Sequence, residues 1–239
     1  AYHEAGHAVA SFYCEHTDPV KVITTVPAGN AGGVTVSVPT EDTLGRSRSE
    51  MFESIIRSLG GRVAEELMMD DISTGASSDI QQATRVARDM VTRYGMSDRL
   101  GPILYGSEHS SDAVFLGRDF SASQNYSDAT AAAIDEEIHR LIDEAQTKCR
   151  NILVEHKDKL EFVAQFLLKH ETMDGDQFKA VMENEYVTVE MIEEIAAEKE
   201  RASREANEKK KAAEEATPAE EAPKKTTRKR TTKKAAEEK

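Results

Sequence analysis

The sequence lacks any run of about 18 consecutive apolar residues, the length that a membrane-spanning helix requires. It also has no initiator Met and no signal peptide, so we expect the 239-residue chain, as it stands, to be soluble. Only two cysteines are present, Cys14 and Cys149, and they lie far apart. This scarcity argues against a disulfide framework and against a cysteine-based metal site, and it fits a reducing compartment.

Basic residues are also in short supply. The chain has 31 Lys and Arg against 44 Asp and Glu, which gives a formal net charge of −13 at pH 7. Residues 197–239 differ from the rest, because 14 basic and 10 acidic residues there accompany no aromatic residue and no aliphatic residue larger than Ala. Such a segment buries too little apolar surface to offset the entropy lost on ordering. We therefore expect a folded domain at residues 1–196 and a charged, disordered tail at residues 197–239.

The charge distribution also bears on partners. Without its tail the body is even more acidic than the whole chain, and such a surface is a poor binder of nucleic acid. The basic cluster Lys224–Lys234 could contact a polyanion or an acidic membrane surface, but a terminal charge run of this kind is usually a solubilising tail. We therefore expect no nucleic acid among the partners.

The body has the pattern of a mainly α-helical domain. Two β-branched runs, Val20–Val26 and Val34–Val38, are joined by a Gly-rich link and predict a small hairpin, which is the only convincing strand signal. Gly60 and Gly61 interrupt a helical pattern, where two bare backbones in one turn permit another helix to approach closely. Helical spacing of apolar residues predicts helices at 1–15, 47–69, up to 94, 123–156, 157–170, 174–184 and 188–197.

The first helix carries the sequence HEAGH. His3 and His7 are four residues apart, so both imidazoles leave the same helix face and can bind one tetrahedral zinc ion. Glu4 can then reach a water molecule at the metal without itself binding the metal, as peptide hydrolysis requires. The pattern also arises by chance in helices. The small residues between the histidines, the otherwise apolar helix and the paired glycines available to pack on it favour the functional interpretation.

A catalytic zinc needs three protein ligands and an open position. His16 is a poor third ligand, because nine residues from His7 place it half a turn away from the ligand face. Tyr13 occupies the place where a longer His-containing version of the motif has its last ligand. The third ligand is therefore expected to be a distant carboxylate, and the residues alone leave open Glu65, Glu66, Asp70, Asp71 and Asp79.

Several motifs together resemble one family, the FtsH-type membrane-anchored, ATP-dependent zinc metalloproteases. The motifs follow the family's peptidase domain in order over roughly residues 1–185, and the run from Ser73 to Pro102 is the most specific of them. They are AYHEAGHA, GGRVAEEL, STGASSDIQQATRVARDMVTRYGMSDRLGP, VFLGR and YSDATAAAIDEEI. The resemblance implies a zinc endopeptidase.

The same resemblance implies roles for individual residues. His3, His7 and Asp79 match the zinc ligands and Glu4 matches the catalytic base, while Glu65 matches a glutamate whose plausible role is to orient a ligand histidine. The strand beside the metal is implied to hold an unfolded substrate by β-addition. Here that strand begins with Gly33, Val34, Thr35 and Val36.

For the whole protein, the resemblance implies one Zn²⁺ per subunit, a homohexamer, unfolded membrane and cytoplasmic proteins as substrates, and a place at the cytoplasmic face of the bacterial membrane. The sequence has no Gly-rich phosphate-binding loop, so we expect ATP to act only through an absent ATPase module, and the membrane only through absent N-terminal segments. The chain is thus expected to be a C-terminal peptidase fragment. The alternative is a catalytically idle oligomerisation platform, against which the intact Glu4 argues.

Overall fold

A computed structural model describes residues 1–27, 32–39, 45–106, 126–199, 201 and 204. Residues Ala1–Ile195 form one compact unit. Four features named in the sequence analysis lie wholly or mostly outside the described residues: the Gly-rich link at 28–31, the motif VFLGR at 114–118, the first residues of the long helix at 123–125, and the tail after residue 204. The disorder of the tail therefore stays a prediction.

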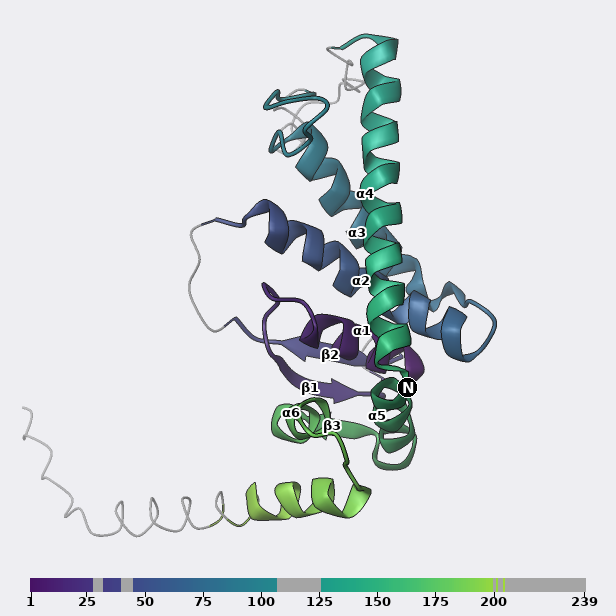
Figure 1. The fold of residues 1–239 in the computed structure, drawn as a ribbon, viewed down its shortest axis with the longest axis vertical. Coiled ribbons are helices and arrows are strands. Elements are labelled where there is room, and N and C mark those ends of the chain that lie inside the picture. The colour runs from purple at the N-terminus through teal and green to yellow at the C-terminus, as the bar shows by residue number, and fades with distance from the viewer. Residues whose placement is uncertain (28–31, 40–44, 107–125, 200, 202–203, 205–239) are drawn as a thin grey trace, which may run out of the picture. The chain divides into compact units, whose positions relative to one another are not determined.

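The described chain is mainly α-helical, as the sequence predicts, and contains one small sheet (Figure 1). Local capping residues determine where two helices begin, because a capping box forms at Ser47 and Glu50 and another at Asp174 and Gln177. Residues 189–199 are also helical. The labelled helices are α1 (Tyr2–Phe12), α2 (Arg48–Met68), α3 (Ser77–Thr92), α4 (Asp128–Glu155), α5 (Lys157–His170) and α6 (Gly175–Glu183), with a 3₁₀ turn at Thr74–Ala76.

The sheet has one strand more than the predicted hairpin. Strands β1 (Val20–Thr24) and β2 (Val34–Ser37) pair antiparallel as predicted, and β3 (Thr172–Asp174) adds to the other side of β1, so the order is β2-β1-β3. The predicted hairpin is confirmed, and β3 was not predicted because its three residues, of which Met173 alone is buried, are too few to give a strand signal. With β1 in the centre, β2 is an edge strand of this sheet.

Helices α1 and α2 pack with their backbones almost in contact. A Cβ atom added at Gly6 would lie 2.4 Å from the carbonyl oxygen of Gly60 and 2.5 Å from the Cβ of Ala64. The close approach predicted from Gly60 is thus confirmed, and its partner is α1. This contact fixes the position and rotation, relative to α2, of the helix that carries HEAGH. Ile55, Val63 and Val9 are fully buried around it.

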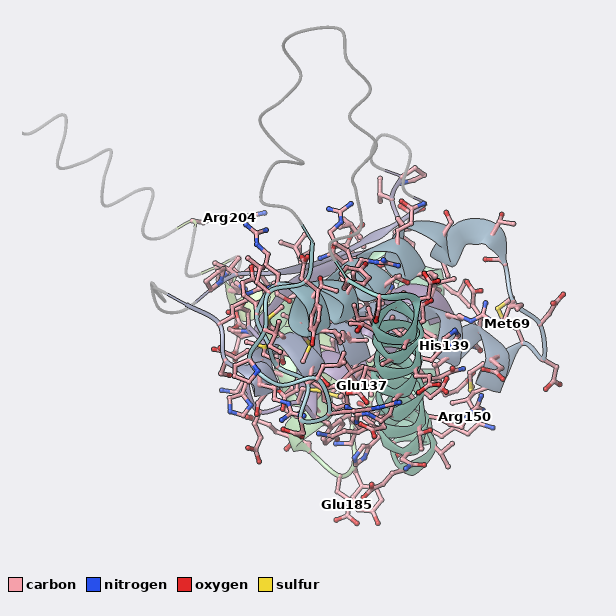
Figure 2. The ribbon with its side chains drawn as sticks, turned by 90° about the horizontal axis from the view of Figure 1, so that it is seen from above. Met69, Glu137, His139, Arg150, Glu185 and Arg204 are labelled. Atoms are coloured by element: carbon pink, nitrogen blue, oxygen red, sulfur yellow. The ribbon has the colours of Figure 1, made fainter. Side chains whose placement is uncertain are left out.

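Helix α4 is the long amphipathic helix predicted from the sequence. Figure 2 shows Glu137 on the side of α4 that faces the body and His139 on the opposite side. Glu137 is buried and accepts hydrogen bonds from Ser97 and Arg140, which anchors the turn after α3 to α4. Within the described residues, no helix combines the length and the apolar character needed to cross a membrane.

Candidate metal centre

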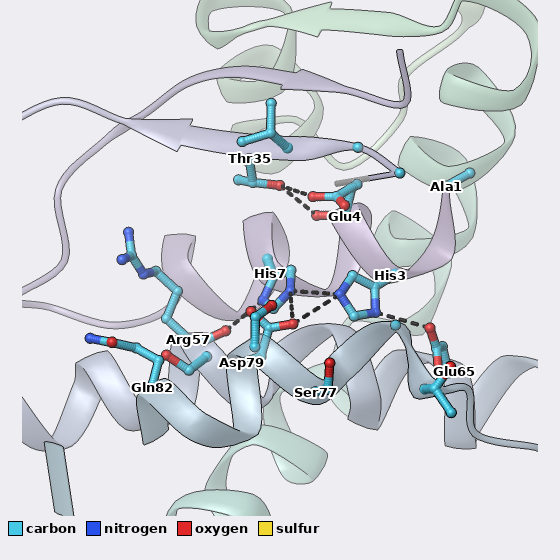
Figure 3. A pocket seen from close by; sticks show the side chains of 17 residues that line it. Ala1, His3, Glu4, His7, Thr35, Arg57, Glu65, Ser77, Asp79 and Gln82 are labelled. Carbon is cyan, nitrogen blue, oxygen red and sulfur yellow. Dashed lines mark hydrogen bonds and ion pairs between the residues drawn. The ribbon is translucent and has the colours of Figure 1, made fainter. Parts of the chain in front are cut away.

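Three side chains from two helices meet at one point (Figure 3). His3 and His7 project from the same face of α1, as their spacing predicts, and their Nε2 atoms are 3.1 Å apart. Asp79, in the first turn of α3, places its Oδ2 atom 3.2 Å from Nε2 of His3 and 3.6 Å from Nε2 of His7. The three atoms form a nearly regular triangle. Among the described residues this is the one group of three or more His, Cys, Asp or Glu side chains with metal-binding geometry.

The size of the triangle fits zinc. A tetrahedral zinc ion with ligand distances of about 2.0–2.1 Å has neighbouring ligand atoms about 3.3 Å apart. The three separations here, 3.1, 3.2 and 3.6 Å, lie around that value. Two imidazoles and a carboxylate are also a donor set that zinc accepts, and three protein ligands leave a fourth position open.

In the rings of His3 and His7, the hydrogen bond made by Nδ1 determines which nitrogen carries the proton of the neutral ring. Nδ1 of His7 lies 2.7 Å from the carbonyl oxygen of Arg57, and because a carbonyl only accepts, Nδ1 carries the proton of the neutral ring. Nδ1 of His3 lies 2.9 Å from Oε1 of Glu65, which accepts in the same way. Both Nε2 atoms are then unprotonated in the neutral rings. Their lone pairs converge with the carboxylate of Asp79, an arrangement that a cation at its centre would stabilise.

Without a metal, a proton takes part of that role. The pKa of His3 lies above its usual value, chiefly because the ring is hydrogen-bonded to Asp79, although burial opposes the rise. Burial acts to raise the pKa of Asp79 as well, but the hydrogen bonds with His3 and His7 outweigh it and hold that pKa well below its usual value. Asp79 is therefore ionised at neutral pH and available as a ligand.

Glu65, in the last turn of α2, contacts the side of the His3 ring that faces away from the centre. It is buried, and besides His3 it accepts hydrogen bonds from the backbone N–H of Ser73 at 2.9 Å and from the Ser73 hydroxyl at 3.1 Å. Burial would raise the pKa of Glu65, but these hydrogen bonds together with that of His3 lower it below its usual value. Glu65 thus remains a charged acceptor that fixes the orientation of the His3 ring.

Glu4 lies on the other side of the centre, against β2. The hydroxyl of Thr35 donates to Oε2 of Glu4 at 3.0 Å and to its backbone oxygen at 3.1 Å. A Cβ atom at Gly33 would lie 2.9 Å from both Cγ and Oε1 of Glu4, so the missing side chain makes room for the carboxylate. The hydrogen bond from Thr35 was not foreseen, because nothing in a sequence relates two residues 31 positions apart on a helix and a strand.

One cleft of about 920 Å³ contains all of these groups. Gly33, Val34 and Thr35 line it beside Glu4, whereas Val36 is not among the lining residues. Sequence reasoning also missed Arg57, whose carbonyl holds His7 and which lines the same cleft. The other lining residues are Ala1, His3, His7, Gly32, Ser58, Glu65, Thr74, Gly75, Ser77, Ser78, Asp79 and Gln82.

The remaining candidates for the third ligand lie elsewhere. His16 lies beyond the end of α1, which is shorter than predicted, and pairs with Glu53 at 3.2 Å. Glu66 points to the surface and pairs with Arg150 of α4 at 2.6 Å. Asp70 and Asp71 are exposed in the turn after α2, and neither belongs to the triangle.

Comparison with known proteins gives one consistent family. The model of Peptidase family M41 matches residues 1–181. The ATP-dependent zinc metalloprotease FtsH 2 of Alkaliphilus metalliredigens is 51% identical over 187 residues, which are 78% of this chain and 27% of that protein. The ATP-dependent zinc metalloprotease FtsH of Bacillus subtilis is 47% identical over 184 residues, 77% of this chain and 29% of that protein. The chain thus spans less than a third of the length of these curated relatives.

Proposed function

This chain belongs to peptidase family M41, and we propose that it is the peptidase domain of an FtsH-type protein, a zinc-dependent endopeptidase that hydrolyses peptide bonds of unfolded proteins. One observation carries the proposal. The Nε2 atoms of two imidazoles and a carboxylate oxygen converge at zinc-ligand spacing, with the carboxylate of Glu4 and an edge strand lining the same cleft.

The atoms that would hold zinc are Nε2 of His3, Nε2 of His7 and Oδ2 of Asp79. When bound, a zinc ion supplies Lewis-acid chemistry, polarising a carbonyl group and lowering the pKa of a water molecule to about 7. Glu65 and the Arg57 carbonyl keep protons on the two Nδ1 atoms, so that each ring presents its Nε2 lone pair to the centre. These two acceptors preorganise the site before the metal arrives.

Proton transfer falls to Glu4. Its carboxylate takes the proton of the attacking water and delivers it to the nitrogen of the departing amine, acting first as a base and then as an acid. The hydroxyl of Thr35 holds one of its oxygens, which restricts the carboxylate to one orientation beside the centre. Glu4 follows His3 directly on α1, so the base and the ligands share one rigid element.

The substrate is held by β2. As the edge strand of the described sheet it has one side available for pairing, and an extended polypeptide can add there through backbone hydrogen bonds. We assign this role to Gly33, Val34, Thr35 and Val36, of which the first three line the cleft. Folded proteins rarely offer a free extended segment, so this mode of binding selects unfolded ones.

We further infer the context of the complete protein. The relatives are named ATP-dependent, which supports an ATPase module that unfolds substrates and delivers them to this cleft. Resemblance to FtsH-type proteins also supports a homohexamer at the cytoplasmic face of the bacterial membrane. An oligomerisation platform without catalysis is the alternative, and the arrangement of Glu4 beside the three ligand atoms favours the enzyme.

The proposal is tested by hydrolysis of casein, an unstructured protein, with zinc supplied and no ATP. We expect Glu4→Gln to keep its bound zinc and lose cleavage, and Asp79→Asn to lose both. Bound zinc is measured in each purified variant. If the wild-type chain, Glu4→Gln and Asp79→Asn are all folded, all hold zinc and are equally inert, this chain is a platform and the assignment of Asp79 as a ligand is wrong.

A further inference from the structure

Arg57 is a cationic residue of the cleft that the chemistry above uses only through its backbone. It lies on α2 one turn before the Gly60–Gly61 pair, and its carbonyl oxygen accepts the Nδ1 proton of His7 at 2.7 Å. That hydrogen bond fixes the backbone of Arg57 next to a ligand histidine. Figure 3 shows its side chain extending along the cleft on the side of His7 away from His3, with Gln82 of α3 on the same side.

The guanidinium group of Arg57 differs from every other charged side-chain group lining the cleft. The carboxylates of Glu4, Glu65 and Asp79 each have partners, namely Thr35 for the first and the ligand histidines for the others. Among the described residues, no hydrogen bond or ion pair to the Arg57 guanidinium occurs, although 44 acidic residues are present in the chain. Arg57 is half-buried, and its guanidinium therefore keeps all of its donors available to a ligand that enters the cleft.

We propose that Arg57 binds an acidic side chain of the substrate close to the bond that is cleaved, so that the enzyme prefers segments containing Asp or Glu there. The guanidinium presents a planar fork of donors that matches a carboxylate, and Gln82 can add an amide donor from α3. The net charge of −13 repels acidic peptides from the surface as a whole. An attractive contact inside the cleft therefore increases the binding of these substrates most. This inference rests on the proposed peptidase function and assigns its specificity.

The first test maps every bond cleaved in casein by mass spectrometry and then measures kcat/KM for pairs of unstructured peptides that differ only in Glu or Gln beside the cleaved bond. We expect the wild-type chain to favour the Glu peptide by about tenfold, and Arg57→Gln to reduce this ratio to near one. Arg57→Lys, which keeps the charge without the fork, should retain part of the preference. Arg62→Gln, a matched change on the same helix outside the lining residues, should leave the ratio unchanged.

The second test measures binding alone. The zinc-supplied Glu4→Gln chain, with and without Arg57→Gln, is titrated with fluorescent peptides carrying Glu or Gln at each successive position. Tighter binding of Glu peptides that depends on Arg57 supports the inference even if the wild-type chain fails to cleave casein, which would count against the proposed function alone. An Arg57→Gln variant that is folded yet shows the wild-type Glu-to-Gln ratio overturns it. So does an equal loss of cleavage for all peptides, since Arg57 would then act on the reaction and not on the choice of substrate.

Discussion

At the scale of single residues, Glu65 and Glu66 offer a natural comparison, because adjacent carboxylates of α2 have different surroundings. Glu65 is buried against Nδ1 of His3 and the backbone of Ser73, whereas Glu66 pairs with Arg150 at the surface. We expect Glu65→Gln to weaken zinc binding by about 10- to 100-fold, because the ring of His3 loses a charged acceptor that fixes its orientation. Glu66→Gln should leave zinc affinity unchanged. Competition with a chromophoric chelator measures both, and equal affinities for the two variants would contradict the role given to Glu65.

At the scale of elements, the contact between α1 and α2 sets the position of HEAGH. Gly6→Ala would bring a Cβ to within 2.4 Å of the Gly60 carbonyl, and because that atom belongs to the backbone of a packed helix it cannot simply turn away. We expect a loss of about 1–3 kcal/mol in the free energy of unfolding, measured in urea without zinc, together with weaker zinc binding as α1 is displaced. Gly45→Ala is the control, since a Cβ there meets nothing within 4 Å. Unchanged stability and zinc affinity in Gly6→Ala would show that α1 is not positioned by this contact.

The elements also show which parts of the structure could be predicted from the sequence. Helical periodicity and the capping residues are local, so the helices and the shared face of His3 and His7 could be predicted from spacing alone. The meeting of α1 with α3 is not local: spacing left five carboxylates open as third ligand, and only resemblance to a family pointed to Asp79, which the fold places 3.2 Å from His3. Strand β3 and the hydrogen bond of Thr35 to Glu4 could not be predicted for the same reason, because both depend on how distant segments pack.

At the scale of the whole molecule, metal binding should be coupled to folding, because the three proposed ligand atoms belong to α1 and α3, which only the folded core brings together. A ligand that binds only the folded state stabilises it by about 2.7 kcal/mol at a concentration of 100 times its Kd. We therefore expect zinc to raise the thermal midpoint of the chain by several degrees and to have no such effect on Asp79→Asn. Differential scanning calorimetry with and without a chelator measures this.

The tail provides the last comparison at this scale. All three proposed ligands and every residue that lines the cleft lie within the unit Ala1–Ile195, and residues 197–239 contain no large apolar side chain to add to its core. A chain ending at residue 196 should therefore show the same zinc-dependent rise in the thermal midpoint and the same rate of casein hydrolysis as the full chain. A smaller rise would mean that the tail contributes to the folded domain, and the boundary predicted at residue 196 would be wrong. A loss of casein hydrolysis with an unchanged rise would instead give the tail a part in capturing substrates, through an excess of basic over acidic residues that the body does not have.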